Sequence, residues 1–166
     1  MKTVENPAQI RFLGDMHNGY EFLSNMHRCT IVIDGQGYGS TEHYYQSQKA
    51  TNEALRKYII AAPTPYYAKL VASVIRKKDK DPRWHERNLG VMRTALLAKF
   101  TQNLELGEKL IATGNAILLE ANEEDEFWGT GREGNGTNML GKLLMELREK
   151  LALEKELKSL EKAFGI

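Results

Sequence analysis

The spacing of apolar residues changes along the chain, from a β-branched pattern near the N-terminus to a helical pattern further on. Within residues 10–39, the run CTIVI is followed by Asp34-Gly35 and a short aromatic segment, which predicts a β-hairpin. From Ser40 onward, apolar positions recur at helical spacing. We expect helices over residues 40–62, 64–76, 84–100, 104–113 and 138–164, and a short strand over 115–121 that returns to the sheet. The predicted fold class is α+β, a mostly helical single domain with a small antiparallel sheet near the N-terminus.

The last predicted helix has two parts. Leu140, Leu144, Leu147 and Leu151 recur at steps of four, three and four, which is typical of a core-facing stripe. Leucines continue at 153, 157 and 160. This second part packs on the domain or pairs with another subunit, and the pattern favours packing. We therefore divide the chain into a domain over 1–152 and a C-terminal helical extension over 153–166.

Composition narrows the class of protein. The 166 residues suffice for one domain with a real core, and 42% apolar with 27% charged residues is ordinary for a globular protein. A formal net charge of only +1 does not indicate general nucleic-acid binding. The single cysteine, Cys29, excludes a disulfide within the chain. No stretch has the apolar length of a signal peptide or membrane span, so we expect a cytoplasmic protein with no membrane partner.

A glycine-rich stretch, DEFWGTGREGNGTNMLG at residues 125–141, directly precedes the start of the last helix. Glycine allows positive φ and close approach of the backbone to a ligand. Amides at a helix start, with Arg132 beside them, suit a phosphate or pyrophosphate group. Trp128 could stack on a base or a sugar, and Thr137 and Asn138 are N-cap candidates. The alternative interpretation is a purely structural turn, because the stretch is neither a P-loop nor a dinucleotide-binding motif.

A second polar stretch, STEHYYQSQK at residues 40–49, opens the first predicted helix. On a continuous helix Glu42 and Lys49 share a face about 10 Å apart along the axis, with Tyr45 and Gln46 between them. Such a face is either solvated or lines a pocket. The four histidines show no metal-ligand spacing, so we expect no metal site. The mixed-charge run RKKDKD at 76–81 is interpreted as a solvated loop, with contact to a nucleic-acid backbone as the alternative.

Five pieces of the sequence together resemble the NADAR (YbiA-like) family. They are FLSN at 22–25, YGSTEHYYQSQK at 38–49, KF at 99–100, ATG at 112–114 and DEFWGTGREGNGTNMLGKLLMELR at 125–148. Their order covers roughly residues 12–150. Two positions depart mildly from the family pattern: Met26 stands where an aromatic residue is commoner, and Ala50 where Phe is commoner. Either change would reshape pocket walls without altering the charged groups.

The resemblance implies a small α+β fold and hydrolysis of N-glycosidic bonds, and we expect no cofactor. Two substrate classes are associated with the family. One is ADP-ribose on the amino group of guanine in nucleic acid, which leaves a toxin–antitoxin partner open. The other is a phosphorylated ribosylamino-pyrimidine intermediate of riboflavin synthesis. In both substrates an exocyclic amine is attached to the anomeric carbon, and such a glycosylamine can open its ring to an imine.

The resemblance also carries residue roles. Neutral Lys49 would attack the imine and hold the sugar as a Schiff base, while Glu42 would donate the proton and then activate water. In a direct-displacement version, Glu42 and Asp125 would be the acid/base pair. The substrate-binding residues carried over from the family motifs are Ser24, Asn25, Tyr45, Gln46, Trp128, Gly129, Gly131, Arg132 and Asn138.

Three functions follow from these residues. The first expectation is an enzyme that removes ADP-ribose from guanine, because the glycine stretch has more anion-binding capacity than one phosphate needs. The second is cleavage of the ribosylamino-pyrimidine phosphate. The third is a module that binds ADP-ribose or NAD without turnover, which the presence of both an acid and an amine disfavours. The sequence leaves the oligomeric state open.

Overall fold

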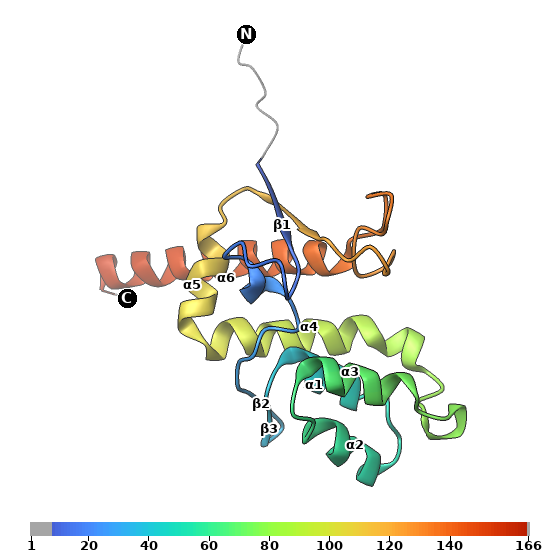
Figure 1. Ribbon diagram of the computed structural model, residues 1–166. Helices are drawn as coiled ribbons and strands as arrows, with labels where there is room; N and C mark the ends of the chain where they lie inside the picture. Colours follow the sequence, from blue (N-terminus) through green and yellow to red (C-terminus); the bar gives the residue numbers. More distant parts are fainter. Residues whose placement is uncertain (1–7, 166) are drawn as a thin grey trace. The chain divides into compact units, whose positions relative to one another are not determined.

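The computed structural model describes residues 8–165 of the chain, and the ribbon is shown in Figure 1. These residues form two compact units, one made of Ser24–Leu106 and the other of the segments before and after it. Both units contain helices and a two-stranded sheet, so the α+β class and the helical majority are confirmed. No helix within residues 8–165 combines the length and the apolar character that crossing a bilayer requires.

The unit formed by residues 24–106 is built around one short, buried helix. Its elements are β2 (Ile31–Ile33), β3 (Gln36–Tyr38), α1 (Thr41–Ser47), α2 (Glu53–Ile60), α3 (Pro65–Ser73), the 3₁₀ helix η2 (Lys77–Asp79) and α4 (Trp84–Gln102). Helix α1 packs against α2, α3 and α4, and all seven of its residues are buried. A polar helix in such a place needs internal hydrogen bonds, which makes α1 the natural centre for a site.

The predicted hairpin is confirmed. Strands β2 and β3 pair antiparallel, with Ile31 opposite Tyr38. Asp34 and Gly35 connect them at φ values of 51° and 79°, and two consecutive positive φ values are what a type I′ turn requires. The Asp-Gly pair therefore sets the register that brings Tyr38 to the core, just before α1 begins.

The prediction of one helix over residues 40–62 is wrong, because the chain breaks between α1 and α2. The amide of Lys49 donates to the carbonyl of Gln46, and Ala50 then forms an antiparallel bridge with Lys80. Asn52 starts α2 by accepting the amide of Leu55 at its side-chain oxygen, 3.1 Å away. Lys49 consequently lies beyond the end of α1, and the predicted helical rise of about 10 Å from Glu42 does not apply.

The second unit contains a parallel strand pair. Its elements are β1 (Gln9–Phe12), the 3₁₀ helix η1 (Glu21–Leu23), the larger part of α5 (Leu104–Ala112), β4 (Ile117–Glu120) and α6 (Met139–Phe164). The predicted strand over 115–121 exists as β4, but it pairs with β1 in parallel, with Gln9 opposite Ile117. It therefore returns to the predicted strand region 10–39, but the expectation of a single antiparallel sheet is wrong, because this pair is parallel and separate from the hairpin. Helix α6 packs on β4, where Leu118 and Leu144 are fully buried.

One glycine allows α6 to approach β4 closely. A Cβ at Gly141 would lie 2.1 Å from the carbonyl oxygen of Leu118 and 2.5 Å from the side-chain nitrogen of Asn138. We expect Gly141→Ala to lower the free energy of unfolding by about 1–3 kcal/mol, the usual cost of overpacking. The matched control is Gly90→Ala on α4, where a Cβ meets nothing within 4 Å and helix propensity should raise stability by about 0.5–1 kcal/mol. Urea denaturation measures both, and equal values for the two variants would contradict the close approach.

The end of α6 extends beyond the core-facing part. Leu153, Leu157, Leu160 and Phe164 are 47–75% exposed. The expectation that residues 153–164 pack on the domain is therefore wrong. The helix continues without a break through this segment, so the boundary predicted at 152 marks a change of surface rather than a change of element.

Candidate active site

The N-terminus of α1 is held by Asn25, one of the predicted site residues. The backbone oxygen of Asn25 accepts the amide of Glu42, 3.3 Å away, and its side-chain oxygen accepts the hydroxyl of Thr41, 3.0 Å away. Its side-chain nitrogen points to the sulfur of Met92 on α4. Asn25 therefore fixes the position at which the carboxyl of Glu42 enters the core.

A buried lysine, Lys99, holds Ser24, the residue directly before Asn25. The Nζ of Lys99 on α4 donates to the backbone oxygen of Ser24 at 2.8 Å, and the Lys99 side chain is completely buried. Burying an ammonium is costly unless it is hydrogen-bonded, so this contact holds the Ser24–Asn25 segment against α4. Lys99 belongs to the motif KF and was not among the predicted site residues, although a lysine inside the apolar run LLAKF was an available signal.

Glu42 and Gln46 form a buried pair on one face of α1. The side-chain nitrogen of Gln46 donates to Oε1 of Glu42 at 2.6 Å, and the two residues are 5% and 4% exposed. The side-chain oxygen of Gln46 is buried and has no hydrogen-bond partner among the residues that the structure describes. Because an unsatisfied buried acceptor costs about 1–3 kcal/mol, a donor from a bound molecule would be favourable at this oxygen.

Lys49 follows the end of α1 and lies against two aromatic rings. Its Nζ is 5.1 Å from the ring centroid of Tyr45 and 5.7 Å from that of Trp84. The two rings contact each other edge to face, with centroids 4.9 Å apart. Ring faces attract a cation, so the ammonium group is oriented by Tyr45 and Trp84. Trp84 was not among the predicted site residues, and its only signal in the sequence was a large aromatic residue close after Pro82 in the charged break.

His43 is a structural residue of α1. Its Nε2 lies 3.0 Å from the carbonyl oxygen of Ala62 and its Nδ1 lies 2.7 Å from the hydroxyl of Ser40. The neutral imidazole satisfies both, with Nε2–H donating to the carbonyl and the hydroxyl donating to Nδ1. Ser40 also caps the helix by accepting the amide of His43. Burial lowers the pKa of His43, against a smaller opposing effect of the Ala62 carbonyl.

This pKa shift predicts how stability depends on pH. The folded state binds a proton on His43 less readily than the unfolded chain, so stability falls as pH drops below the ordinary value of 6.5. The slope from this residue is at most about 1.4 kcal/mol per pH unit, the limit for one proton. We expect His43→Gln to flatten the stability profile between about pH 7.5 and pH 5.5. The exposed His85 gives the control, and an unchanged slope in His43→Gln together with a changed slope in His85→Gln would contradict this assignment.

The predicted residues of the glycine-rich stretch lie in the other compact unit. Asp125 begins it, and one carboxylate oxygen of Asp125 accepts the amides of Phe127 and Trp128 at 3.0 and 2.7 Å. That oxygen therefore shapes the turn into the aromatic pair formed by Phe127 and Trp128, whose ring centroids are 5.0 Å apart. A role of Asp125 as the second catalytic carboxylate stays a prediction.

The expectation of glycine amides turned towards an anion is wrong for the loop as it stands. The amides of Gly129, Gly131, Gly134 and Gly136 each donate to a backbone carbonyl within residues 122–131. The first amides of α6 are also engaged, since Met139 donates to Phe127 and Leu140 donates to Trp128. A Cβ at Gly129 or Gly136 would lie within 2.9 Å of backbone atoms. The glycines therefore serve the loop's own close packing, and contact with an anion falls to the exposed Arg132 as a prediction.

Asn138 occupies the N-cap position of α6, as the sequence predicts, but its side chain does not cap the helix. Its oxygen accepts the amide of Glu120 at 3.0 Å and its nitrogen donates to the carbonyl of Leu118 at 2.8 Å. Asn138 adopts a φ of 53°, in the left-handed region that asparagine tolerates. It ties the end of the glycine-rich loop to β4, which is a structural function.

The structure thus divides the predicted site residues into two groups. One group surrounds α1 and contains Ser24, Asn25, Glu42, Tyr45, Gln46 and Lys49; the other follows β4 and contains Asp125, Trp128, Gly129, Gly131, Arg132 and Asn138. Within residues 8–165, no cluster of three or more histidine, cysteine or acidic side chains could hold a metal ion. A buried carboxyl beside a buried amide, with an oriented lysine at the helix end, is suited to proton transfer and covalent chemistry.

Comparison with known proteins supports the family that the sequence motifs predict. The NADAR domain model matches residues 11–152. The chain is 44% identical to the N-glycosidase YbiA of Escherichia coli over 138 residues, which are 82% of this chain and 84% of that protein. It is 36% identical over 130 residues to a riboflavin biosynthesis protein of Vibrio vulnificus, covering 78% of this chain and 35% of that longer protein. The NMR structure of E. coli YbiA matches with a TM-score of 0.81 and 39% identity, covering 93% of this chain and 91% of that one.

The chain therefore belongs to the NADAR family, as the sequence motifs indicate. The prediction of an N-glycosidase is confirmed, because the N-glycosidase YbiA of E. coli is 44% identical over 84% of its own length.

Proposed function

We propose that this chain hydrolyses the bond between the anomeric carbon of a phosphorylated ribose and an exocyclic amine. The observation that carries the proposal is the buried hydrogen bond between Gln46 and Glu42 on α1, with Lys49 held at the end of that helix. A glycosylamine opens to an imine, and this unit offers a proton donor for the opening and an amine for the exchange. The riboflavin-related name of one relative supports a ribosylamino-pyrimidine phosphate as the substrate.

The proposed reaction has two halves. Glu42, in its acid form, gives a proton to the ring oxygen, and the C1–O bond breaks as an imine forms between C1 and the amine nitrogen. The deprotonated amine of Lys49 adds to C1, and the amine of the base leaves with a proton. Water then adds to the lysine imine, Lys49 departs, and the free sugar phosphate closes its ring. Glu42 returns to its acid form by taking up the protons that Lys49 and water release, so the complete reaction consumes only water.

The resting state of Lys49 places a condition on this route. The faces of Tyr45 and Trp84 stabilise the ammonium form, which is not a nucleophile. Lys49 must therefore lose a proton before it attacks, and the carboxylate that ring opening leaves on Glu42 is the proposed acceptor. The unsatisfied oxygen of Gln46 would accept a hydrogen bond from the exocyclic N–H of the substrate.

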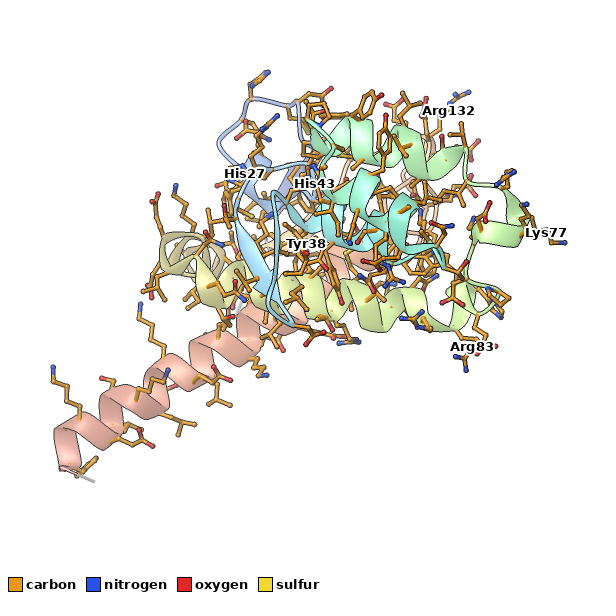
Figure 2. All side chains as sticks on the ribbon, turned by 90° about the horizontal axis from the view of Figure 1, so that it is seen from below. His27, Tyr38, His43, Lys77, Arg83 and Arg132 are labelled. Atoms are coloured by element: carbon orange, nitrogen blue, oxygen red, sulfur yellow. The ribbon has the colours of Figure 1, made fainter. Side chains whose placement is uncertain are left out.

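A second candidate substrate is ADP-ribose on the amino group of guanine in nucleic acid. The observation that favours it is a group of exposed basic side chains around η2 and the start of α4, including Lys77 and Arg83 (Figure 2), which suits a phosphate backbone. The anion capacity that first favoured this substrate is reduced, since the glycine amides are engaged within their loop. We therefore rank it second.

A panel of three compounds tests the proposal. The purified chain is incubated with a ribosylamino-pyrimidine phosphate, with an oligonucleotide that carries ADP-ribose on guanine, and with an ordinary nucleotide linked through a ring nitrogen. We expect mass spectrometry to detect ribose phosphate from the first compound and none from the third. Release of ADP-ribose from the second compound alone would establish the second candidate. Cleavage of the third compound at a rate equal to the first would contradict the requirement for an exocyclic amine.

A further inference from the structure

The segment of α6 over residues 153–164, which we name the α6 tail, has an apolar face that does not continue the core-facing stripe. Leu153 follows Leu144 by nine positions, which is about two and a half helical turns. Leu153 therefore points away from the side on which Leu144 is buried against β4. Leu157, Leu160 and Phe164 follow at steps of four, three and four, and share the face of Leu153. The family match ends at residue 152, just before this face begins.

Charged residues on the α6 tail are segregated around the apolar face. At about 100° per residue, Glu154 and Glu161 flank it on one side and Glu156 on the other. The lysines of the tail lie further round, and Lys155 pairs with Glu108 of α5. An apolar stripe with acidic borders would meet like charges in a second copy of itself. Its charge pattern instead fits an apolar surface with basic borders.

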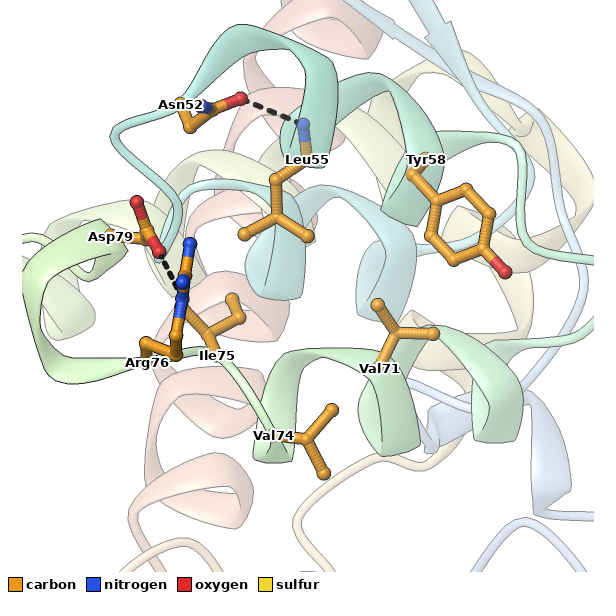
Figure 3. Close-up of a pocket in the computed structure, with 8 residues that line it drawn as sticks. All are labelled: Asn52, Leu55, Tyr58, Val71, Val74, Ile75, Arg76 and Asp79. Atoms are coloured by element: carbon orange, nitrogen blue, oxygen red, sulfur yellow. Dashed lines mark hydrogen bonds and ion pairs between the residues drawn. The ribbon is translucent and has the colours of Figure 1, made fainter.

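The chain contains a surface of that kind on α2 and α3. An open groove of about 290 Å³ lies there, and Figure 3 shows its lining residues Asn52, Leu55, Tyr58, Val71, Val74, Ile75, Arg76 and Asp79. Its apolar wall is unusually exposed, since Tyr58 and Val74 are 57% and 73% accessible. This volume is at the lower end of the range of small-molecule sites, about 300–1,000 Å³. None of its lining residues belongs to the predicted active site.

Basic side chains dominate the sequence around this groove. Residues 53–80 contain seven lysines and arginines against two acidic residues. Arg76 lies at one end of the groove and pairs with Asp79, and Lys57 extends from α2 with most of its side chain exposed. The groove thus combines aliphatic side chains with flanking elements in which basic residues outnumber acidic ones by seven to two, and this excess is the complement of the acidic α6 tail.

We propose that the α2–α3 groove binds the α6 tail of a second copy of this chain, with Leu157 and its neighbours entering the groove. An amphipathic helix in an apolar groove is a common mode of recognition, in which residues at steps of three and four are the anchors. The association buries two exposed apolar surfaces that have no other function in the described chain, and it places acidic borders against basic ones. The interaction leaves Glu42 and Lys49 unchanged.

Sedimentation of the full chain over a range of concentrations tests the proposal with two variants. We expect the wild type to self-associate, and Leu157→Asp on the tail and Val74→Asp in the groove each to raise the dissociation constant at least about 30-fold, as loss of an anchor does. Ser159→Asp on the tail and Thr94→Asp on α4 add the same charge at exposed positions away from both surfaces, and should associate like the wild type.

Mixing the two disrupted variants gives a decisive result. Leu157→Asp keeps an intact groove and Val74→Asp keeps an intact tail, so the mixture should associate although each variant alone does not. A monomeric wild type at every concentration would overturn the proposal. It would also be overturned if Val74→Asp associated like the wild type, because the tail would then bind elsewhere. Circular dichroism of each variant confirms that α6 and the domain remain folded.

Discussion

Glu42→Gln is expected to lose most of the glycosidase activity while the protein stays folded. The amide oxygen at position 42 can still accept the hydrogen bond from Gln46, so the pair on α1 is preserved. The amide cannot donate a proton to the ring oxygen or take one from Lys49. General acid–base catalysis is worth about 10²–10⁴-fold, so kcat should fall by that factor with a smaller change in KM.

Steady-state kinetics on the ribosylamino-pyrimidine phosphate measure this effect. Glu53→Gln supplies the matched control, because Glu53 is an exposed carboxyl on α2 whose ion pairs with Arg56 and Lys57 are weak surface contacts. Glu53→Gln should retain wild-type kcat. A Glu42→Gln variant with unchanged kcat, or one that loses activity only because its unfolding transition has collapsed, would remove Glu42 from the catalytic role.

Lys49→Arg is expected to be as inactive as Lys49→Met. Arginine keeps a cation over the rings of Tyr45 and Trp84, but it does not deprotonate in proteins and cannot form the lysine imine. If the amine is the nucleophile, both variants should fall by about 10³-fold or more in kcat, as loss of a covalent nucleophile does. Lys49→Met should also lose the contact between the cation and the rings.

The pair of variants separates two roles for Lys49. An ammonium that only binds the substrate or orients the rings would be replaced well by arginine, so Lys49→Arg would keep much of its kcat. Lys57→Met, at an exposed lysine of α2, controls for the loss of a positive charge in the same unit. Activity in Lys49→Arg close to that of the wild type would favour the direct-displacement route, in which no covalent bond to lysine forms.

Local sequence signals predicted the elements that depend on local chemistry. Asp34-Gly35 identified the hairpin, since its two positive φ values suit those residue types. The leucine stripe identified the core-facing part of α6, where Leu140 and Leu144 are buried. The break after α1 was not predictable in this way, because it depends on the bridge between Ala50 and Lys80, thirty residues apart in the sequence. Asn52 caps the start of α2, but an asparagine alone does not show that the preceding helix has ended.

The candidate site was also predictable only where local motifs define it, and not where distant segments meet. The motifs identified Glu42, Gln46 and Lys49 as polar residues worth assigning, and the structure places them on and just after one buried helix. Trp84 could not be found from spacing, because only the fold brings the start of α4 next to Tyr45. The glycines led to a wrong prediction. Their number indicated an irregular loop with amides available to an anion, but those amides donate to backbone carbonyls whose positions the sequence does not reveal.

Reduction with borohydride during turnover shows whether Lys49 becomes covalently bound to the sugar. The chain is mixed with substrate, reduced, digested and weighed by mass spectrometry. We expect a reduced ribose phosphate adduct on the peptide that contains Lys49, absent from Lys49→Arg and absent when reduction is done without substrate. An active enzyme that yields no adduct, or an adduct confined to another lysine such as Lys99, would contradict it.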